Sequence, residues 1–147
     1  MQKALLTFIF IFLTTFANNL FALEKGSWTL TKDNDWCYIG SLPIKSDLPE
    51  TKKRGENYIL VYKLIGRDEN IVQVEAGYQY NLEKKIVVKI DNTSFKFYST
   101  EDSSETAWTN NDEKVVYAMK KGLELVLSGQ SSRGTTTNDT YTLKGFT

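Results

Sequence analysis

Few side chains in this sequence have the types needed for catalysis. There is no histidine, and the single cysteine is Cys37. Ser-His and Cys-His pairs are therefore excluded, and the commonest general base and metal ligand is missing. A Ser-Lys pair is formally possible, for instance Ser128 or Ser131 with Lys144, but nothing in their spacing singles it out. We expect no catalytic residues and keep a histidine-free hydrolase as an alternative.

Carboxylates are the remaining candidates for metal binding. The most closely grouped ones are Glu101-Asp102 with Glu105, and Asp112-Glu113. Neither group follows the Asp-x-Asp-x-Asp-Gly spacing of a calcium loop. The first group is typical of a solvated loop, and the second fits the start of a helix. We therefore expect no metal and no cofactor, although oxygen-only calcium sites can be irregular.

Three residues are candidates for binding: Arg54, Trp108 and Arg133. Arg133 lies in a hydroxyl-rich segment that forms either a polar recognition loop or a glycine-centred turn with exposed threonines. Arg54 ends the proline-containing loop 42–54, where a solvent-exposed turn is the default. Trp108 precedes the expected helix, where an indole either binds a ligand or packs the helix against a sheet.

Charge and cysteine content restrict the possible partners. The 18 basic and 18 acidic residues give a formal net charge of zero, which argues against a nucleic-acid-binding protein. Cys37 has no second cysteine with which to form an internal disulfide. Because it lies between Trp36 and Tyr38 in an apolar run, we expect it to be buried and inert.

The first 22 residues have the pattern of a secretory signal peptide. Lys3 supplies a positive charge, residues 4–16 are apolar or hydroxyl-bearing, and Ala22 offers a small residue for cleavage. The apolar run is shorter than the roughly 20 residues of a spanning helix, which leaves an uncleaved anchor as the alternative. We expect cleavage near Ala22, one domain over residues 23–147 without a transmembrane span, and a periplasmic, outer-membrane-associated or secreted location.

The elements that must position the candidate residues are mainly strands. Residues 71–76 and 86–90 alternate apolar and polar side chains, which is typical of antiparallel strands with one buried face. Residues 58–65 are nearly all apolar, which predicts a central strand covered on both faces. Further strands are expected at residues 28–30, 36–41, 95–97, 123–128 and around 141–143, with a tight turn at Asp91-Asn92.

One helix is expected over residues 112–121. Thr109 and Asp112 have the spacing of a capping box, Lys120 and Lys121 complement the negative end of the helix dipole, and Gly122 follows as a stop. Eight or so strands with one helix predict a mainly-β domain. Two packed antiparallel sheets are the simplest way to bury so many one-sided strands, and a closed barrel is the alternative.

The order of motifs from Trp28 to Thr147 is similar to that of the invasion-associated locus B family of bacterial envelope proteins. The motifs are Trp28-Thr29-Leu30, Cys37-Tyr38-Ile39 with Ser41 and Pro43, Arg54-Gly55, Ala76-Gly77-Tyr78, Ile90-Asp91 with Phe95, Ala107-Trp108, Ala118-Met119-Lys120-Lys121-Gly122, Ser131-Ser132-Arg133-Gly134-Thr135, Asp139-Thr140-Tyr141 and Gly145-Phe146-Thr147. The resemblance implies an immunoglobulin-like β-sandwich, export across the inner membrane, and no known catalysis.

The functional expectation is a non-enzymatic, exported envelope protein with a binding role. Its loops near Arg54 and Arg133 would contact an unidentified component of the envelope or of a host surface. Besides the histidine-free hydrolase, a structural subunit that assembles by pairing of edge strands is an alternative.

Overall fold

The computed structural model describes residues 23–147, so the expected signal peptide, residues 1–22, lies outside the described part. The strands form one antiparallel, 10-stranded sheet in the order β1-β2-β4-β5-β8-β7-β6-β9-β10-β3. They are β1 (Thr29–Lys32), β2 (Trp36–Ser41), β3 (Lys45–Ser46), β4 (Tyr58–Leu64), β5 (Ile71–Glu75), β6 (Ile86–Ile90), β7 (Thr93–Thr100), β8 (Ser103–Trp108), β9 (Glu124–Gln130) and β10 (Thr136–Thr142), with one helix, α1 (Asp112–Lys121).

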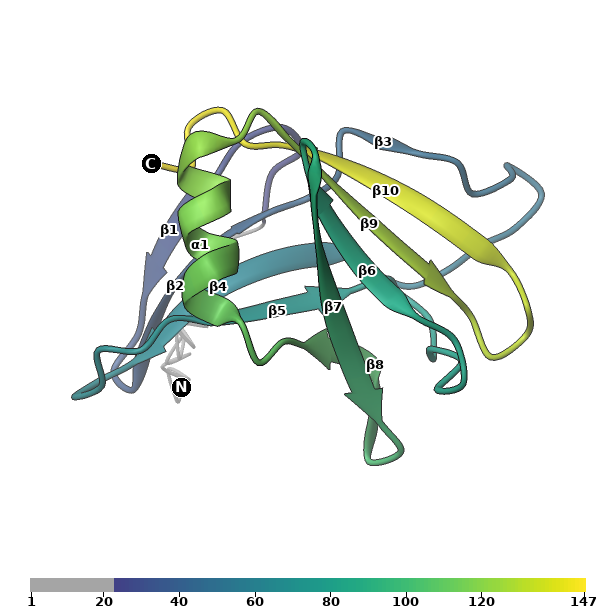
Figure 1. Cartoon of the computed structure of the whole chain (residues 1–147), viewed down its shortest axis with the longest axis horizontal. Helices are drawn as coiled ribbons and strands as arrows, with labels where there is room; N and C mark the ends of the chain where they lie inside the picture. The colour runs from purple at the N-terminus through teal and green to yellow at the C-terminus, as the bar shows by residue number, and fades with distance from the viewer. Residues whose placement is uncertain (1–22) are drawn as a thin grey trace, which may run out of the picture.

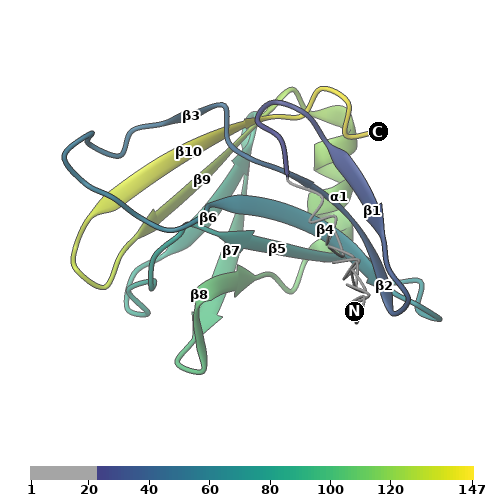
Figure 2. The same ribbon diagram turned by 180° about the vertical axis from the view of Figure 1, so that it is seen from behind.

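The sheet curls into a half-barrel, as Figures 1 and 2 show from opposite sides. The long strand β7 lies at the bend. Its residues 93–97 pair with β6, whereas Tyr98 and Thr100 pair with β8, with a shift in register between these two residues. Such an irregularity bends a strand and increases its twist. The mainly-β, antiparallel architecture with one helix is confirmed. The immunoglobulin-like sandwich is not confirmed, because the strands form one continuous sheet.

The concave face of the half-barrel holds the core. Val72 and Val74 on β5, Val88 on β6 and Leu125 on β9 are all fully buried and belong to one apolar cluster. The alternation predicted for β5 and β6 is therefore confirmed. In β4 the consecutive residues 59–61 are buried, as expected for a strand covered on both faces.

The helix α1 lies across one open end of the half-barrel (Figure 1) and turns Val115, Val116 and Met119 inward. The capping box predicted at its start is wrong. The N-cap is Asn111, and its side chain makes no capping bond. Asp112 instead accepts a hydrogen bond from the Val72 N–H at 2.7 Å, so its carboxylate joins the helix to β5. Burial raises the pKa of Asp112, and this hydrogen bond opposes the rise.

Close packing explains why a glycine follows α1. Gly122 ends the helix as predicted, but in an extended conformation and not in the left-handed one. A Cβ atom at this position would lie 2.7 Å from Ile90 Cγ2 and 2.9 Å from Leu143 Cδ1. The tight turn between β6 and β7 is confirmed: Asp91 has a φ of 47°, and its carboxylate accepts the Leu123 N–H.

Three further details differ from the sequence-based expectations. Cys37 is half-buried and not buried, because β2 has only the short edge strand β1 on one side. Of the acidic group expected in a solvated loop, Glu101 and Asp102 form the exposed turn between β7 and β8 as predicted, whereas Glu105 lies in β8. The loop 42–54 contains the short strand β3, which pairs with β10. Among residues 23–147 no helix is long and apolar enough to cross a membrane.

Candidate functional site

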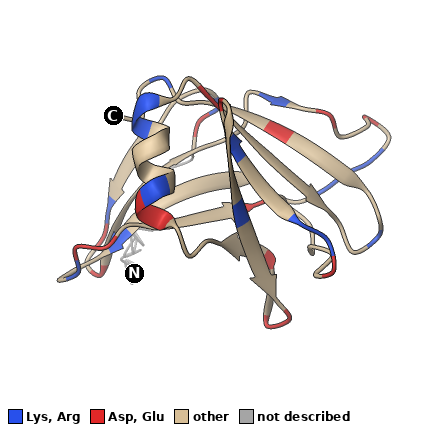
Figure 3. Cartoon of the chain, in the orientation of Figure 1, with Lys and Arg blue, Asp and Glu red and all other residues tan. Residues whose placement is uncertain are grey.

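A polar cleft of about 650 Å³ lies where three segments distant in sequence meet. Residues 52–54 come from the loop before β4, residues 77–79 follow β5, and residues 131–133 with Thr135 form the turn between β9 and β10. Leu48 and Glu105 complete the lining. Figure 3 shows basic residues along the first segment and at the tip of the β9–β10 turn. We call this hollow the basic cleft.

One wall of the basic cleft is fixed by a buried ion pair. The Arg54 guanidinium donates from Nη1 to Asp139 Oδ2 at 2.7 Å and from Nη2 to Asp139 Oδ1 at 2.5 Å. The side chain of Arg54 is 9% exposed and that of Asp139 is fully buried. Burial lowers the pKa of Arg54, but the hydrogen bonds and charge of Asp139 outweigh it and raise the pKa above its ordinary value. Arg54 is therefore charged, and its partner lies on β10.

Further contacts use up the terminal nitrogens of Arg54. Nη1 also donates to the Ala76 carbonyl at 3.0 Å, and Nη2 donates to Ser46 Oγ at 2.9 Å. Because a guanidinium has five N–H groups, four of which sit on these two nitrogens, only Nε–H is left for a ligand. Arg54 thus joins the loop before β4 to β3, β5 and β10, and serves mainly as a frame for the cleft.

The backbone at the floor of the cleft is unusually close-packed. The Gly55 N–H donates to the Gly77 carbonyl at 2.8 Å. Gly77 has a φ of 74°, and a Cβ atom added there would lie 2.3 Å from the Gly55 carbonyl oxygen. The close approach therefore requires glycine at position 77, whereas a Cβ atom at Gly55 would lie 3.4 Å from the Gly77 carbonyl oxygen, an ordinary contact.

Aromatic side chains lie behind the cleft. Tyr78 and Tyr80 pack edge to face with 5.4 Å between ring centroids. The Tyr78 hydroxyl hydrogen-bonds to Thr137 Oγ1 at 2.9 Å, whereas those of Tyr80 and Tyr141 have no hydrogen-bond partner among residues 23–147. Burial is the main cause that raises the pKa of all three tyrosines. They are neutral at physiological pH.

The turn that carries Arg133 is held by its own hydrogen bonds. The Ser131 N–H donates to the Thr135 carbonyl at 2.8 Å, and the Thr135 N–H donates to Ser131 Oγ at 3.1 Å. The Ser132 N–H donates to the Gln79 carbonyl at 2.8 Å, which ties the turn to the segment after β5. The predicted glycine-centred turn is present, with Gly134 at a φ of 88°. Its geometry presents Arg133 as an exposed cation at the cleft.

The remaining charges of the cleft are mostly positive. Lys52, Lys53 and Arg133 are exposed, and Glu105 is the one acidic residue of the lining. Lys52 Nζ donates to Thr135 Oγ1 at 2.7 Å, which connects the loop to the turn. Since Asp139 balances Arg54, the cleft has a surplus of positive charge in a chain whose formal net charge is zero.

The structure brings two of the three predicted binding residues together. Arg54 and Arg133 both line the basic cleft. Trp108 does not: it is half-buried at the end of β8, beside Gln73 and Tyr98 on the face opposite the buried Ala107. Lys52, Lys53 and Tyr78, which also line the cleft, were not predicted as binding residues from the sequence. The run of basic residues ending at Arg54 was visible, but its position opposite Arg133 depends on pairing between distant strands.

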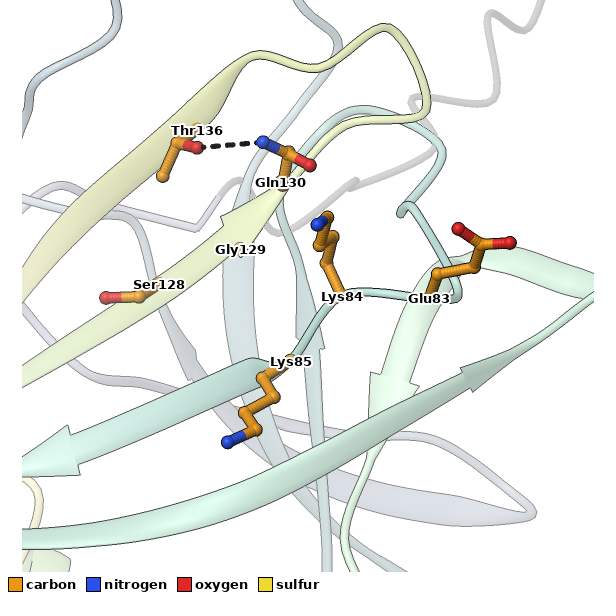
Figure 4. Close-up of a pocket in the computed structure, with 7 residues that line it drawn as sticks. All are labelled: Glu83, Lys84, Lys85, Ser128, Gly129, Gln130 and Thr136. Atoms are coloured by element: carbon orange, nitrogen blue, oxygen red, sulfur yellow. Dashed lines mark hydrogen bonds between the residues drawn. The ribbon is translucent and has the colours of Figure 1, made fainter.

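Two other hollows have different linings. One of about 410 Å³ lies at the start of β6, where Glu83, Lys84 and Lys85 face residues of β9 and β10 (Figure 4). The other, about 310 Å³, lies between β2, β4 and α1 and is mainly apolar, with Cys37 in its lining. Neither contains a predicted binding residue.

The metal-ligand groups and the two candidate serines can be located in the described part of the chain. Within residues 23–147 no three His, Cys, Asp or Glu side chains are grouped to hold a metal ion. Ser128 Oγ donates to Asn138 Oδ1 at 2.6 Å, and Ser131 Oγ accepts from the Thr135 N–H. The hydroxyl groups of both serines therefore have partners other than Lys144.

Comparison with known proteins extends this description. The family model of the Invasion associated locus B (IalB) protein matches residues 31–147. No curated protein matches the chain. Among solved structures, the crystal structure of invasion associated protein B from Bartonella henselae is similar, with a TM-score of 0.56 and 14% sequence identity over 83% of this chain and 87% of that one. Identity this low shows a shared fold alone. The family model spans nearly the whole described sheet, so the resemblance found in the motifs is confirmed, and the chain belongs to the invasion-associated locus B family.

Proposed function

We propose that this chain is an exported, non-enzymatic binding protein of the bacterial envelope and that the basic cleft is its binding site. The observation that carries the proposal is the convergence of the exposed cations Lys53 and Arg133, from segments far apart in the sequence, on one hollow framed by Arg54. Its volume is within the range of small-molecule sites. Hydrogen bonds already hold the backbone around the exposed polar groups in place. Less conformational entropy is therefore lost when a ligand binds, which favours recognition.

The proposed location follows from the N-terminal sequence. Lys3, the apolar run and Ala22 support export with cleavage near Ala22. The ligand would then be a component of the periplasm, the outer membrane or a host surface. Fractionation of cells, with N-terminal sequencing of the mature protein, tests this part: a chain that begins at Met1 in the cytoplasmic fraction would contradict it.

Binding at the cleft is tested by capture from an envelope extract with immobilised residues 23–147. The informative variant is the double substitution Lys53→Ala and Arg133→Ala, since both side chains are exposed and come from different segments of the cleft lining. Arg54 is left intact because its removal would leave Asp139 buried without a partner.

The matched control is Lys84→Ala with Lys85→Ala, which removes the same charge from the other hollow. We expect at least one component to be enriched by the wild-type chain and by the control, and to be lost with the cleft variant. Equal capture by all three proteins would show that the basic cleft is not the binding site.

A further inference from the structure

We infer that the basic cleft recognises a phosphate or sulfate ester carried on a polar body of about the size of a sugar, with Lys53 and Arg133 binding the oxyanion. This inference rests on the proposed function and names the ligand class of the same site. The residues that carry it lie in two segments, the loop before β4 and the turn between β9 and β10.

The positive charges of the basic cleft are only partly balanced by acidic side chains. Among residues 23–147 the one ion pair within 4.0 Å is Arg54 with Asp139. Lys53 and Arg133 therefore have no carboxylate partner in the described chain. Opposite charge attracts most strongly where both groups are held at the wall of a hollow, because field lines are focused there. An anionic ligand would supply the missing counter-charge.

The two cations come from different segments of the cleft lining. Lys53 lies on the loop wall and Arg133 on the turn wall. A carboxylate has two oxygens in one plane, whereas a phosphate or sulfate ester has three terminal oxygens arranged around its centre. An oxyanion of the latter kind can accept hydrogen bonds from both walls at once, and the Arg133 guanidinium can bind two of its oxygens in parallel.

The volume and lining of the cleft indicate what kind of molecule would carry the oxyanion. The cleft of about 650 Å³ is far larger than a bare anion. Its lining offers hydroxyl and amide groups at Ser132 and Gln79, one aromatic ring at Tyr78, and a single aliphatic side chain at Leu48. Groups of this kind suit a hydroxylated ring, which can be hydrogen-bonded at its edge, better than they suit an acyl chain.

The backbone that carries Arg133 is held by hydrogen bonds, and the loop that carries Lys53 is tied to it. The turn at Arg133 is closed by hydrogen bonds between Ser131 and Thr135, and Lys52 bridges to Thr135 across the cleft. Figure 4 shows the contrast at the other hollow, where the Lys84 and Lys85 side chains point away from each other and Glu83 lies beside them. Two lysines there do not face a common point.

Calorimetric titration of residues 23–147 with glucose 6-phosphate, glucose and inorganic phosphate tests the inference. We expect binding of glucose 6-phosphate, weaker binding of inorganic phosphate and none of glucose, with affinity falling as salt is added. The double variant Lys53→Ala, Arg133→Ala should bind glucose 6-phosphate about tenfold more weakly or worse, because two charge-assisted hydrogen bonds are lost. Lys84→Ala with Lys85→Ala should bind as the wild type does.

Glu105→Gln gives a test with the opposite sign. Glu105 is the acidic residue of the lining, so removing its charge should tighten binding of glucose 6-phosphate about twofold. Phosphatidylglycerol vesicles test a lipid source of the oxyanion, and binding to vesicles without binding to glucose 6-phosphate would overturn the sugar-sized body. Absence of binding to every phosphate probe, or equal loss in the Lys84, Lys85 control, would overturn the whole inference.

The two proposals fail in different ways. If envelope material is captured through Lys53 and Arg133 but no phosphate probe binds, the ligand class is wrong and the proposed function stands. If glucose 6-phosphate binds in the cleft but the extract yields no component dependent on these residues, the chemistry stands and the envelope-binding role is wrong.

Discussion

Asp139 is a charged residue that is buried inside the curled sheet and paired with Arg54. It points inward from β10, where it is fully buried, and its two oxygens are both bonded to Arg54. An ion pair of this kind adds little stability compared with an apolar pair of the same shape, but removing one partner leaves a buried charge unbalanced. The Arg54–Asp139 pair therefore affects the stability of the fold mainly when one partner is removed.

We predict that Asp139→Asn destabilises the fold by about 3–5 kcal/mol, because Arg54 is then buried without a counter-charge. Asp102→Asn, on the exposed tip of the β7–β8 hairpin, removes the same charge and should change stability by less than about 0.5 kcal/mol. Urea unfolding of both variants measures the difference. Equal stability of the two variants would mean that Arg54 finds compensation elsewhere, and the account of the cleft wall would be wrong.

Arg54, Arg133 and Asp139 show which parts of the site can be predicted from the sequence and which cannot. Arg54 and Arg133 could be singled out because arginines beside turn glycines are conspicuous. The partner of Arg54 could not, since Asp139 lies 85 residues further along the chain. Arg54 was expected in an exposed turn for that reason. A buried ion pair has no local signal: either charge alone predicts a solvated side chain.

At the scale of elements, the approach of the loop before β4 to the end of β5 shapes the cleft. Gly55 and Gly77 bring two backbones together, and Arg54 and Tyr78, their neighbours in sequence, both line the cleft as a result. Two effects constrain Gly77: a positive φ and the nearness of the Gly55 carbonyl. These effects can be separated experimentally.

Gly66 provides the comparison, because it has a φ of 80° and nothing within 4 Å of an added Cβ. We predict that Gly66→Ala costs about 1–2 kcal/mol, the backbone term alone. Gly77→Ala should cost a further 1–3 kcal/mol or so, since its Cβ would overlap the Gly55 oxygen and force the loop away. Chemical denaturation compares the two variants, and similar losses at both positions would show that the loop yields without strain.

Elements with their own periodicity could be predicted, and those defined by contacts could not. β5 and β6 were predicted because Val72, Val74 and Val88 alternate with outward-facing residues. β8 was missed because its first residues are polar on both faces and Ala107 is its one buried side chain. The capping role given to Asp112 was wrong because its carboxylate bonds to Val72, 40 residues earlier.

For the whole molecule, a net charge of zero conceals an uneven distribution. Figure 3 shows acidic residues at the tip of the β7–β8 hairpin and basic residues along the loop before β4 and at the β9–β10 turn. The pairing of β3 with β10 contributes to this distribution, since it holds the loop that carries residues 52–54 beside the strand that follows Arg133. The composition argued against a nucleic-acid partner, but it could not reveal a local surplus of positive charge.

The tyrosines make the stability of the whole molecule depend on alkaline pH. The pKa values of Tyr58, Tyr78, Tyr80 and Tyr141 are raised above 10.0, with burial the leading cause in each. Above about pH 10 the unfolded chain loses these protons while the folded chain keeps them. The native state then binds more protons, so the free energy of unfolding must fall as pH rises. The stability that the buried, protonated tyrosines contribute is complete below about pH 10 and is lost as the pH rises above it.

We therefore predict that the part of the tyrosinate absorbance that comes from the buried phenols appears together with the loss of far-ultraviolet circular dichroism in one alkaline transition, because these phenols ionise only when the sheet opens. Tyr141→Phe removes one such proton and one hydroxyl that lacks a partner in residues 23–147, so it should move the transition to higher pH. Tyr98→Phe, at a side chain that is 45% exposed, should leave it in place. Ionisation of all eight tyrosines before any loss of structure would contradict the argument, since the phenols behind the basic cleft would then be open to solvent.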